Sequence, residues 1–184
     1  YPIRQLSHPT IKTELKHYGK PVKVYRVGDK QTDKLSIPKD IKNIVLEERR
    51  KLTDQVEELD GFCKYIANQI KYQISLKLSG VHVYYLNLEE LVGVDHVALI
   101  VEYMNNDNLV RLLIDPTFPQ FVRKDNNKLV YLDFWPSDKI TDKGLVNDLI
   151  DSGVSIIDND RFRQYINSIS SIYTEYNLDT FLNS

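Results

Sequence analysis

The sequence predicts an α+β fold, because helical patterns come first in the chain and strand patterns follow them. Apolar residues recur at three- and four-residue intervals over 40–59 and 62–78. Stretches rich in β-branched and other apolar residues come next, at 81–86, 96–103, 109–114 and 129–135. Their close succession indicates an antiparallel sheet. We therefore expect N-terminal helices packed on an antiparallel β-sheet, with a C-terminal helical segment.

The helix expected over 40–59 follows an irregular lead-in at 1–38, which contains one extended stretch at 22–27. Asp40 is suited to cap the start of this helix, since its carboxylate can accept hydrogen bonds from the first turn. The charged run at 47–51 is typical of a solvent-exposed helix face.

The helix expected over 62–78 carries the chain's single cysteine, Cys63, in its first turn, and Gly80 can take the left-handed conformation that ends helices. The N–H groups of a first helical turn lack intrahelical partners, and the helix dipole favours negative charge there. Both effects stabilise a thiolate, which is the nucleophilic form of cysteine. Taken alone, a cysteine on an apolar stripe is more often a small buried hydrophobe.

The strands at 96–103 and 109–114 are separated by the turn-forming run Asn105-Asn106-Asp107-Asn108, which predicts a hairpin. His96 starts the first strand and Asp115 directly follows the second, so we expect them to be cross-strand neighbours. Each alone is more often structural. Together, a carboxylate that orients an imidazole beside a thiol is the arrangement that thiol acyl transfer needs. The sequence thus predicts Cys63, His96 and Asp115 as a catalytic triad.

The C-terminal part is expected to be mostly helical. It is predicted to contain a helix at 141–151 that stops at Gly153, an extended piece at 154–157, and a final helix at 161–177 capped by Asp158 or Asp160.

Composition and charge exclude several classes of protein. The 184 residues suit one domain, and a net charge of −2 with a pI near 6.1 gives no basic stripe for nucleic acid. No apolar run approaches the length that spans a bilayer. The chain starts at Tyr1 without an initiator methionine, so we expect it to be part of a larger polypeptide.

A single cysteine permits no intrachain disulfide and no zinc-finger pair. None of the four histidines has a metal-ligand spacing, and no EF-hand motif occurs, so neither a metal nor a cofactor is expected. A catalytic thiol needs a reducing compartment such as the cytosol.

Several motifs occur in the order found in one enzyme superfamily. They are Gly61-Phe62-Cys63, Ala67, Leu78-Ser79-Gly80-Val81, the strand from His96 to Tyr103, and Leu113-Ile114-Asp115-Pro116-Thr117. This set resembles the core of the transglutaminase-like and papain-like cysteine enzymes, over about a third of the chain. The same Cys-His-Asp order occurs in bacterial toxins that deamidate glutamine, in leader-peptide proteases and in arylamine acetyltransferases.

The resemblance implies a papain-like fold and a thioester mechanism, within one domain over 1–184 whose catalytic core is 39–135 and whose C-terminal helical part is 136–184. The chain departs from the family pattern in three places: Lys64 and Leu99 stand where tryptophans are usual, and Glu57 occupies the papain-like oxyanion position. Gln55, nearby, is a weaker candidate for the oxyanion donor.

Three function classes remain open on these residues. The first is an enzyme acting on protein carboxamides, a glutamine deamidase or transglutaminase, as in an effector domain secreted or translocated into a target cell. The second is a cysteine protease with the same triad. The third is a non-catalytic interaction domain on the same scaffold, and small-molecule acyl transfer is a minor fourth. The expected partner is a protein substrate.

Overall fold

The computed structural model describes residues 22–24, 36–56, 61–126, 128–131, 142–170 and 177–183. Its helices are α2 (Ile37–Thr53), α3 (Cys63–Lys77), α4 (Leu88–Val92), the 3₁₀ turn η2 (Phe118–Gln120), α5 (Lys143–Asp151), α6 (Asn159–Ile169) and α7 (Leu178–Asn183). Its strands are β1 (Val22–Val24), β2 (Val81–Asn87), β3 (Val97–Asn105), β4 (Asn108–Ile114), β5 (Val122–Asp125), β6 (Lys128–Tyr131) and β7 (Val154–Ile156).

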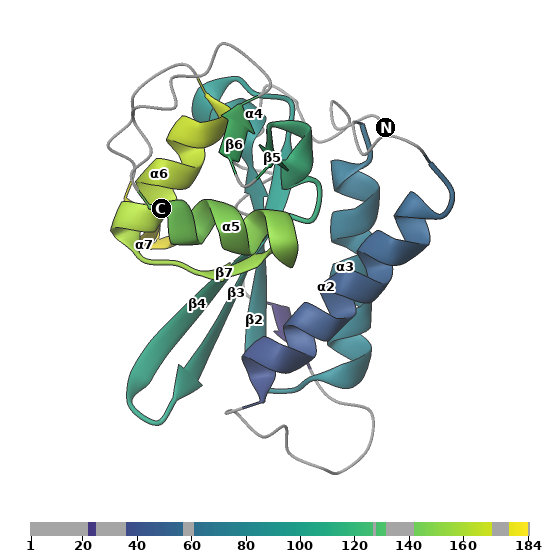
Figure 1. Cartoon of the computed structure of the whole chain (residues 1–184). Coiled ribbons are helices and arrows are strands. Elements are labelled where there is room, and N and C mark those ends of the chain that lie inside the picture. The colour runs from purple at the N-terminus through teal and green to yellow at the C-terminus, as the bar shows by residue number, and fades with distance from the viewer. Residues whose placement is uncertain are drawn as a thin grey trace.

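The chain has an α+β fold built on one main sheet. Five antiparallel strands lie in the order β1-β2-β3-β4-β7, and β5 and β6 form a separate hairpin. Helices α2 and α3 lie to one side of the sheet and α5 and α6 to the other (Figure 1). None of the helices in the described ranges combines the length and the apolar character needed to cross a membrane.

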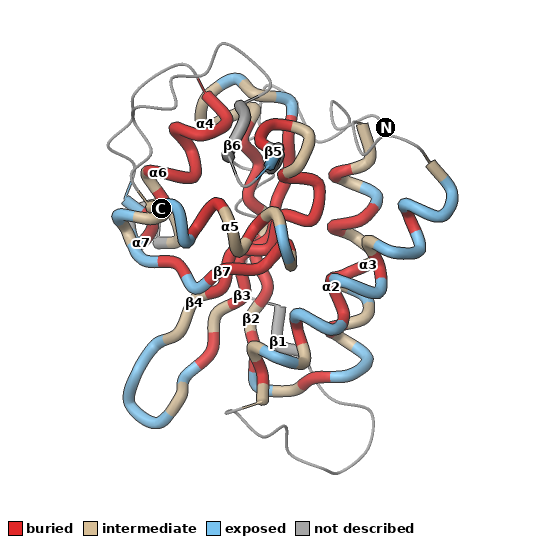
Figure 2. Tube along the Cα trace, viewed as in Figure 1, coloured by how far each residue is buried: buried red, intermediate tan, exposed pale blue. Residues whose placement is uncertain are grey.

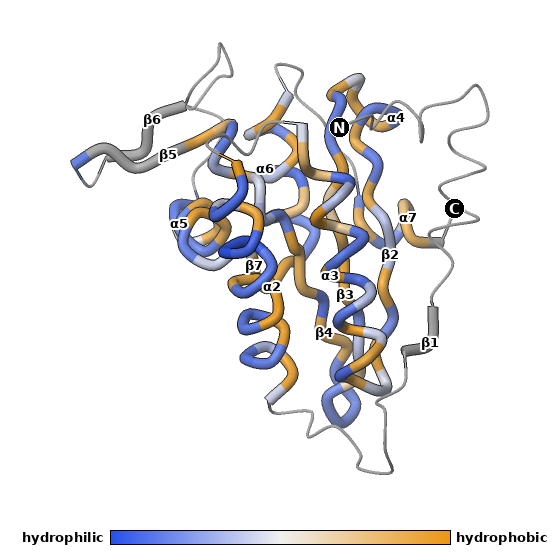
Figure 3. Tube along the Cα trace, turned by 90° about the vertical axis from the view of Figure 1, so that its right-hand side faces the viewer, coloured by the Kyte–Doolittle hydropathy of each residue, from blue (hydrophilic) through white to orange (hydrophobic). Residues whose placement is uncertain are grey.

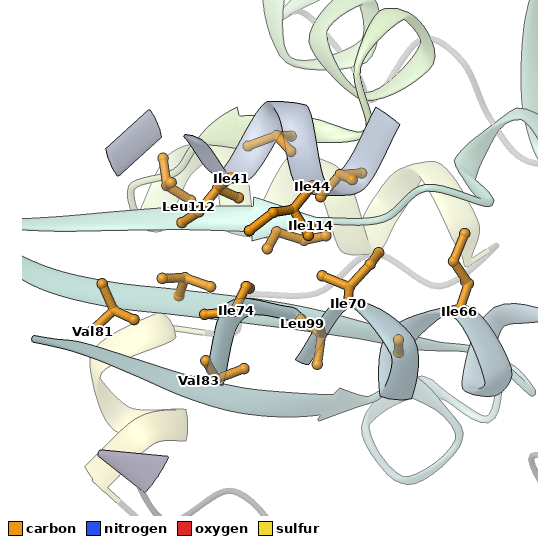
Figure 4. Close-up of a cluster of buried hydrophobic side chains, with 14 of the residues drawn as sticks. Ile41, Ile44, Ile66, Ile70, Ile74, Val81, Val83, Leu99, Leu112 and Ile114 are labelled. Carbon is orange, nitrogen blue, oxygen red and sulfur yellow. The ribbon is translucent and has the colours of Figure 1, made fainter. Parts of the chain in front are cut away.

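The sheet is buried on both faces, and each face builds its own core. Side chains alternate along β3, so that Val97, Leu99 and Val101 join the core under α2 and α3 while Ala98 and Ile100 join the opposite core. Figure 4 shows the first core, where the helices meet the strands. The centre of the sheet is buried and the tip of the β3–β4 hairpin is exposed (Figure 2). This burial explains why the strands are almost continuously apolar.

Helix α2 differs from its prediction at both ends. It begins at Ile37 rather than Asp40, because Pro38 is compatible with a first helical turn and Ser36 precedes it. Asp40 therefore lies inside the helix, where its carboxylate accepts a hydrogen bond from Ser36 Oγ at 3.0 Å. The helix ends at Thr53, and the described residues 54–56 are not helical; 57–59 lie outside the described residues. Figure 3 shows α2 with hydrophilic residues along one side and hydrophobic residues along the other.

The second helix, the strands from 81 to 114 and the helix before Gly153 lie within two residues of their predicted bounds. Strand β6 covers Lys128–Tyr131, and the remainder of the strand predicted at 129–135 lies outside the described residues. One other prediction was too long. Helix α6, capped by Asp158, ends at Ile169 instead of reaching 177, because Ser170 is already extended. Residues 171–176 lie outside the described part of the chain.

Candidate active site

Cys63 is the first residue of α3 and so lies in the first helical turn, as predicted. Gly61, with a φ of 82°, turns the chain into the helix, and Phe62 precedes Cys63 without a side-chain cap. As the first helical residue, Cys63 has a main-chain N–H without an intrahelical acceptor. The side chain is only 2% exposed and packs within the core under α2 and α3. The sulfur is therefore almost completely shielded from solvent.

His96 is fully buried just before β3. The main-chain N–H of His96 donates to the carbonyl of Val94 at 2.7 Å, and the main-chain carbonyl of His96 accepts from the N–H of Leu88 at 2.9 Å. These two bonds fix the main chain on both sides of the imidazole. The position of the ring is thus set by the short turn between α4 and β3, which sequence analysis did not predict.

The His96 imidazole meets the Asp115 carboxylate. Nε2 of His96 lies 2.8 Å from Oδ2 of Asp115, and both side chains have no exposed surface. The β3–β4 ladder pairs Leu99 with Ile114, so continuing this register would set His96 opposite Thr117. The two residues predicted as cross-strand neighbours therefore contact along the diagonal of the hairpin, rather than as a directly opposed pair.

Cys63 also affects the pKa of the His96 imidazole. Burial lowers the pKa of His96, but the charge and hydrogen bond of Asp115, together with a hydrogen bond and the charge of Cys63, raise it from 6.5 to about 10. The structure thus pairs His96 with Asp115, and Cys63 lies close enough to the same imidazole to affect its pKa.

Asp115 is held by three further groups. Its N–H donates to the carbonyl of Gly153 at 2.8 Å. The Thr117 hydroxyl donates to Oδ1 at 3.4 Å, and the Tyr165 hydroxyl donates to Oδ2 at 2.7 Å. Tyr165 comes from α6, so the C-terminal helical part touches the predicted triad directly.

Gln120 and Phe121 lie over the imidazole. The amide nitrogen of Gln120 is 3.4 Å from Nδ1 of His96 and donates to the Thr117 hydroxyl at 3.1 Å. The Phe121 ring stands edge-on to the imidazole, with centroids 4.9 Å apart. Both residues follow the turn at Asp115, and together they help to close the site from solvent.

Arg49 joins α2 to the turn after Asp115. Its guanidinium donates to the carbonyls of Ile150 at 3.0 Å and Asp151 at 2.9 Å, and more weakly to that of Pro116 at 3.4 Å. Burial lowers the pKa of Arg49, while the charges of Asp115 and Asp151 oppose that effect. Arg49 therefore places a positive charge near the carboxylate without pairing with it directly.

Sequence reasoning missed Tyr165, Gln120 and Arg49. Its own oxyanion candidate, Gln55, is exposed after the end of α2, and Glu57 lies outside the described residues. A signal did exist for Tyr165, since it lies beside Phe162 and Ile166 on the apolar side of α6. Its hydroxyl, however, gave no pattern that would link it to Asp115.

In the described part of the chain, no group of three or more His, Cys, Asp or Glu side chains is arranged to hold a metal ion. No protein-family model matches the chain, and comparisons with curated proteins and with solved structures find no match either. What this site can do is therefore argued from its own geometry.

Proposed function

We propose that this chain is a cysteine-dependent acyl-transfer enzyme that acts on protein carboxamides through a thioester. The observation that carries the proposal is the buried His96–Asp115 pair, with Cys63 close enough to the same imidazole to affect its pKa. A nucleophile, a base and a group that orients the base are the parts such chemistry needs. A thiol at a helix start, a histidine before one strand and an aspartate after the next also support a papain-like or transglutaminase-like arrangement.

In the proposed mechanism, Cys63 and His96 rest as a thiolate–imidazolium pair, because the pKa of His96 is raised to about 10. The thiolate of Cys63 attacks the carbonyl carbon of a carboxamide. The main-chain N–H of Cys63 can donate to the oxyanion, since it has no partner within α3. The C–N bond then breaks, and His96 gives its proton to the departing ammonia. Water attacks the thioester and gives a proton to the neutral His96, and the C–S bond breaks to release a carboxylic acid and restore the thiolate–imidazolium pair. An amine in place of water gives transamidation.

A test of thiol reactivity comes first. Iodoacetamide should alkylate Cys63 at neutral pH faster than it alkylates free cysteine, and His96→Gln should remove that advantage. A thiol that does not react in the folded protein would favour the non-catalytic interaction domain.

The reaction itself is tested with an N-blocked glutaminyl-glycine dipeptide and with casein. The wild-type chain should release ammonia and convert glutamine to glutamate, as read by mass spectrometry, and Cys63→Ala should do neither. Cleavage of casein without ammonia release would instead assign the chain to the cysteine proteases.

A further inference from the structure

Two donors from distant parts of the chain meet at one oxygen of Asp115. Oδ2 lies 2.8 Å from Nε2 of His96 and accepts from the Tyr165 hydroxyl at 2.7 Å. We propose that Tyr165 is a positioning residue of the site, whose hydroxyl fixes the rotation of the Asp115 carboxylate and thereby holds His96 toward Cys63. This inference rests on the proposed function, because it concerns the same thiol and imidazole.

The carboxylate needs this second donor because its other contact is weak. Rotation of an aspartate carboxylate about its last torsion is broad and has little intrinsic preference. The main chain of Asp115 is fixed by Gly153, but the only other donor to its carboxylate among the described contacts is the Thr117 hydroxyl, at 3.4 Å. Without the Tyr165 hydroxyl, the hydrogen bond between Asp115 and His96 would have to fix both the carboxylate and the imidazole.

Tyr165 is itself firmly held. It is fully buried on α6, its ring lies 6.1 Å from that of Phe118, and its carbonyl accepts from the Ser168 hydroxyl. Burial, and then the charge of Asp115, raise the pKa of Tyr165 well above its usual value, so the phenol keeps the proton that it donates. The hydroxyl thus arrives at Asp115 from a rigid element.

The other polar groups around Asp115 come from different elements. His96 lies just before β3, Cys63 is at the start of α3, and the charge of Arg49 comes from α2. None of these replaces the Tyr165 hydroxyl. His96 is the group to be positioned, Cys63 makes no hydrogen bond to Asp115 among the described contacts, and Arg49 donates to main-chain carbonyls. Tyr165 can therefore be tested separately.

Tyr165→Phe removes the hydroxyl and keeps the ring. We expect alkylation of Cys63 by iodoacetamide at neutral pH to slow about threefold to tenfold, the range expected for one lost hydrogen bond. The pKa of His96, followed by imidazole ¹⁵N NMR and assigned with His96→Gln, should fall. Tyr103→Phe is the matched control, because Tyr103 is also buried and lies on β3 toward the hairpin tip. It should change neither readout.

A double variant shows whether Tyr165 acts through Asp115. In an Asp115→Ala background, Tyr165→Phe should have no further effect on alkylation. The proposal would be overturned if Tyr165→Phe slowed the alkylation of Cys63 by the same factor in both backgrounds. It would also be overturned if the pKa of His96 in Tyr165→Phe were unchanged or higher. Tyr165→Met also lacks the hydroxyl and serves if Tyr165→Phe does not fold.

The two proposals fail in different ways. An unreactive wild-type thiol would remove the proposed function, whereas the NMR titration of His96 needs no reactive thiol and still judges Tyr165. A reactive wild-type thiol, with Tyr165→Phe identical to wild type in both readouts, would remove only the role of Tyr165.

Discussion

The main-chain N–H of Asp115 donates to the carbonyl oxygen of Gly153, at a distance of 2.8 Å. Gly153 has a φ of +75°, and a Cβ added to it would lie 3.0 Å from Cα of Pro116 and 3.1 Å from Cγ1 of Val45. The start of β7 is therefore pressed against the turn that carries Asp115. A side chain at 153 would have to displace that turn, because the closest atom belongs to the main chain.

Gly153→Ala should both destabilise the fold and disturb the site. Gly80→Ala is the matched control, since Gly80 has the same φ of +75° and nothing within 4 Å of an added Cβ. The control should lower the free energy of unfolding by about 1 kcal/mol from backbone strain alone, as measured by urea denaturation. Gly153→Ala should lower it by at least about twice as much and also slow the alkylation of Cys63. An equal decrease in the free energy of unfolding of the two variants would show that the contact with Pro116 is unimportant.

Arg49 should contribute far more to stability than its neighbour Arg50. The Arg49 fork donates to carbonyls at the end of α5, whereas Arg50 is exposed and pairs with Glu47 and Asp54 on its own helix. Arg49→Lys keeps the charge but loses the planar fork, and we expect it to lower the free energy of unfolding by about 1–3 kcal/mol. Arg50→Lys should cost less than about 0.5 kcal/mol. Chemical denaturation measures both changes. Similar decreases in the free energy of unfolding for Arg49→Lys and Arg50→Lys would contradict the larger role of Arg49.

The three central side chains could be predicted because they lie at ends of secondary structure. Cys63 follows the Asp60-Gly61 break, and His96 and Asp115 flank strands joined by an Asn-rich turn. A hairpin brings its open ends together whatever its exact register, so their proximity followed from local patterns. The diagonal geometry did not, because strand β4 ends at Ile114 and the turn after it sets the direction of the Asp115 side chain.

The supporting groups could not be read from local patterns. Tyr165 is fifty residues from Asp115 in sequence, and Arg49 is sixty-seven from Pro116. Their contacts depend on how α2 and α6 pack on opposite faces of the sheet, which is a long-range property. The over-long helix expected at 161–177 has a related cause, since apolar periodicity continues past a residue, Ser170, whose main chain is already extended.

Gln120 should restrain the thiol. Its amide nitrogen lies 3.4 Å from Nδ1 of the fully buried His96, so it covers the imidazole that is proposed to activate Cys63. Gln120→Ala should therefore raise the rate at which iodoacetamide alkylates Cys63, by about fivefold at most, because so long a contact is worth no more than about 1 kcal/mol.

The control for Gln120 is Gln55→Ala. Gln55 is exposed after α2, so its removal should leave the alkylation rate unchanged. A slower reaction in Gln120→Ala would instead show that this amide assists the thiolate. A slower reaction in Gln55→Ala would return Gln55 to consideration as a donor at the site.

Protonation of His96 should make the stability of the fold depend on pH. Burial lowers its pKa, but Asp115 and Cys63 together raise it from 6.5 to about 10. The resulting stabilisation is fully present below about pH 6.5 and is lost as pH rises through the folded pKa. In Cys63→Ala, whose thiol no longer titrates, the free energy of unfolding should fall as pH rises above 6.5, by up to about 1.4 kcal/mol per unit. The pH at which this fall ends should be lower in Cys63→Ala than in the wild type, since Cys63 no longer helps to raise the pKa of His96. Urea denaturation of Cys63→Ala with His96→Gln supplies the comparison, and an equal fall in that double variant would mean that other groups cause the dependence.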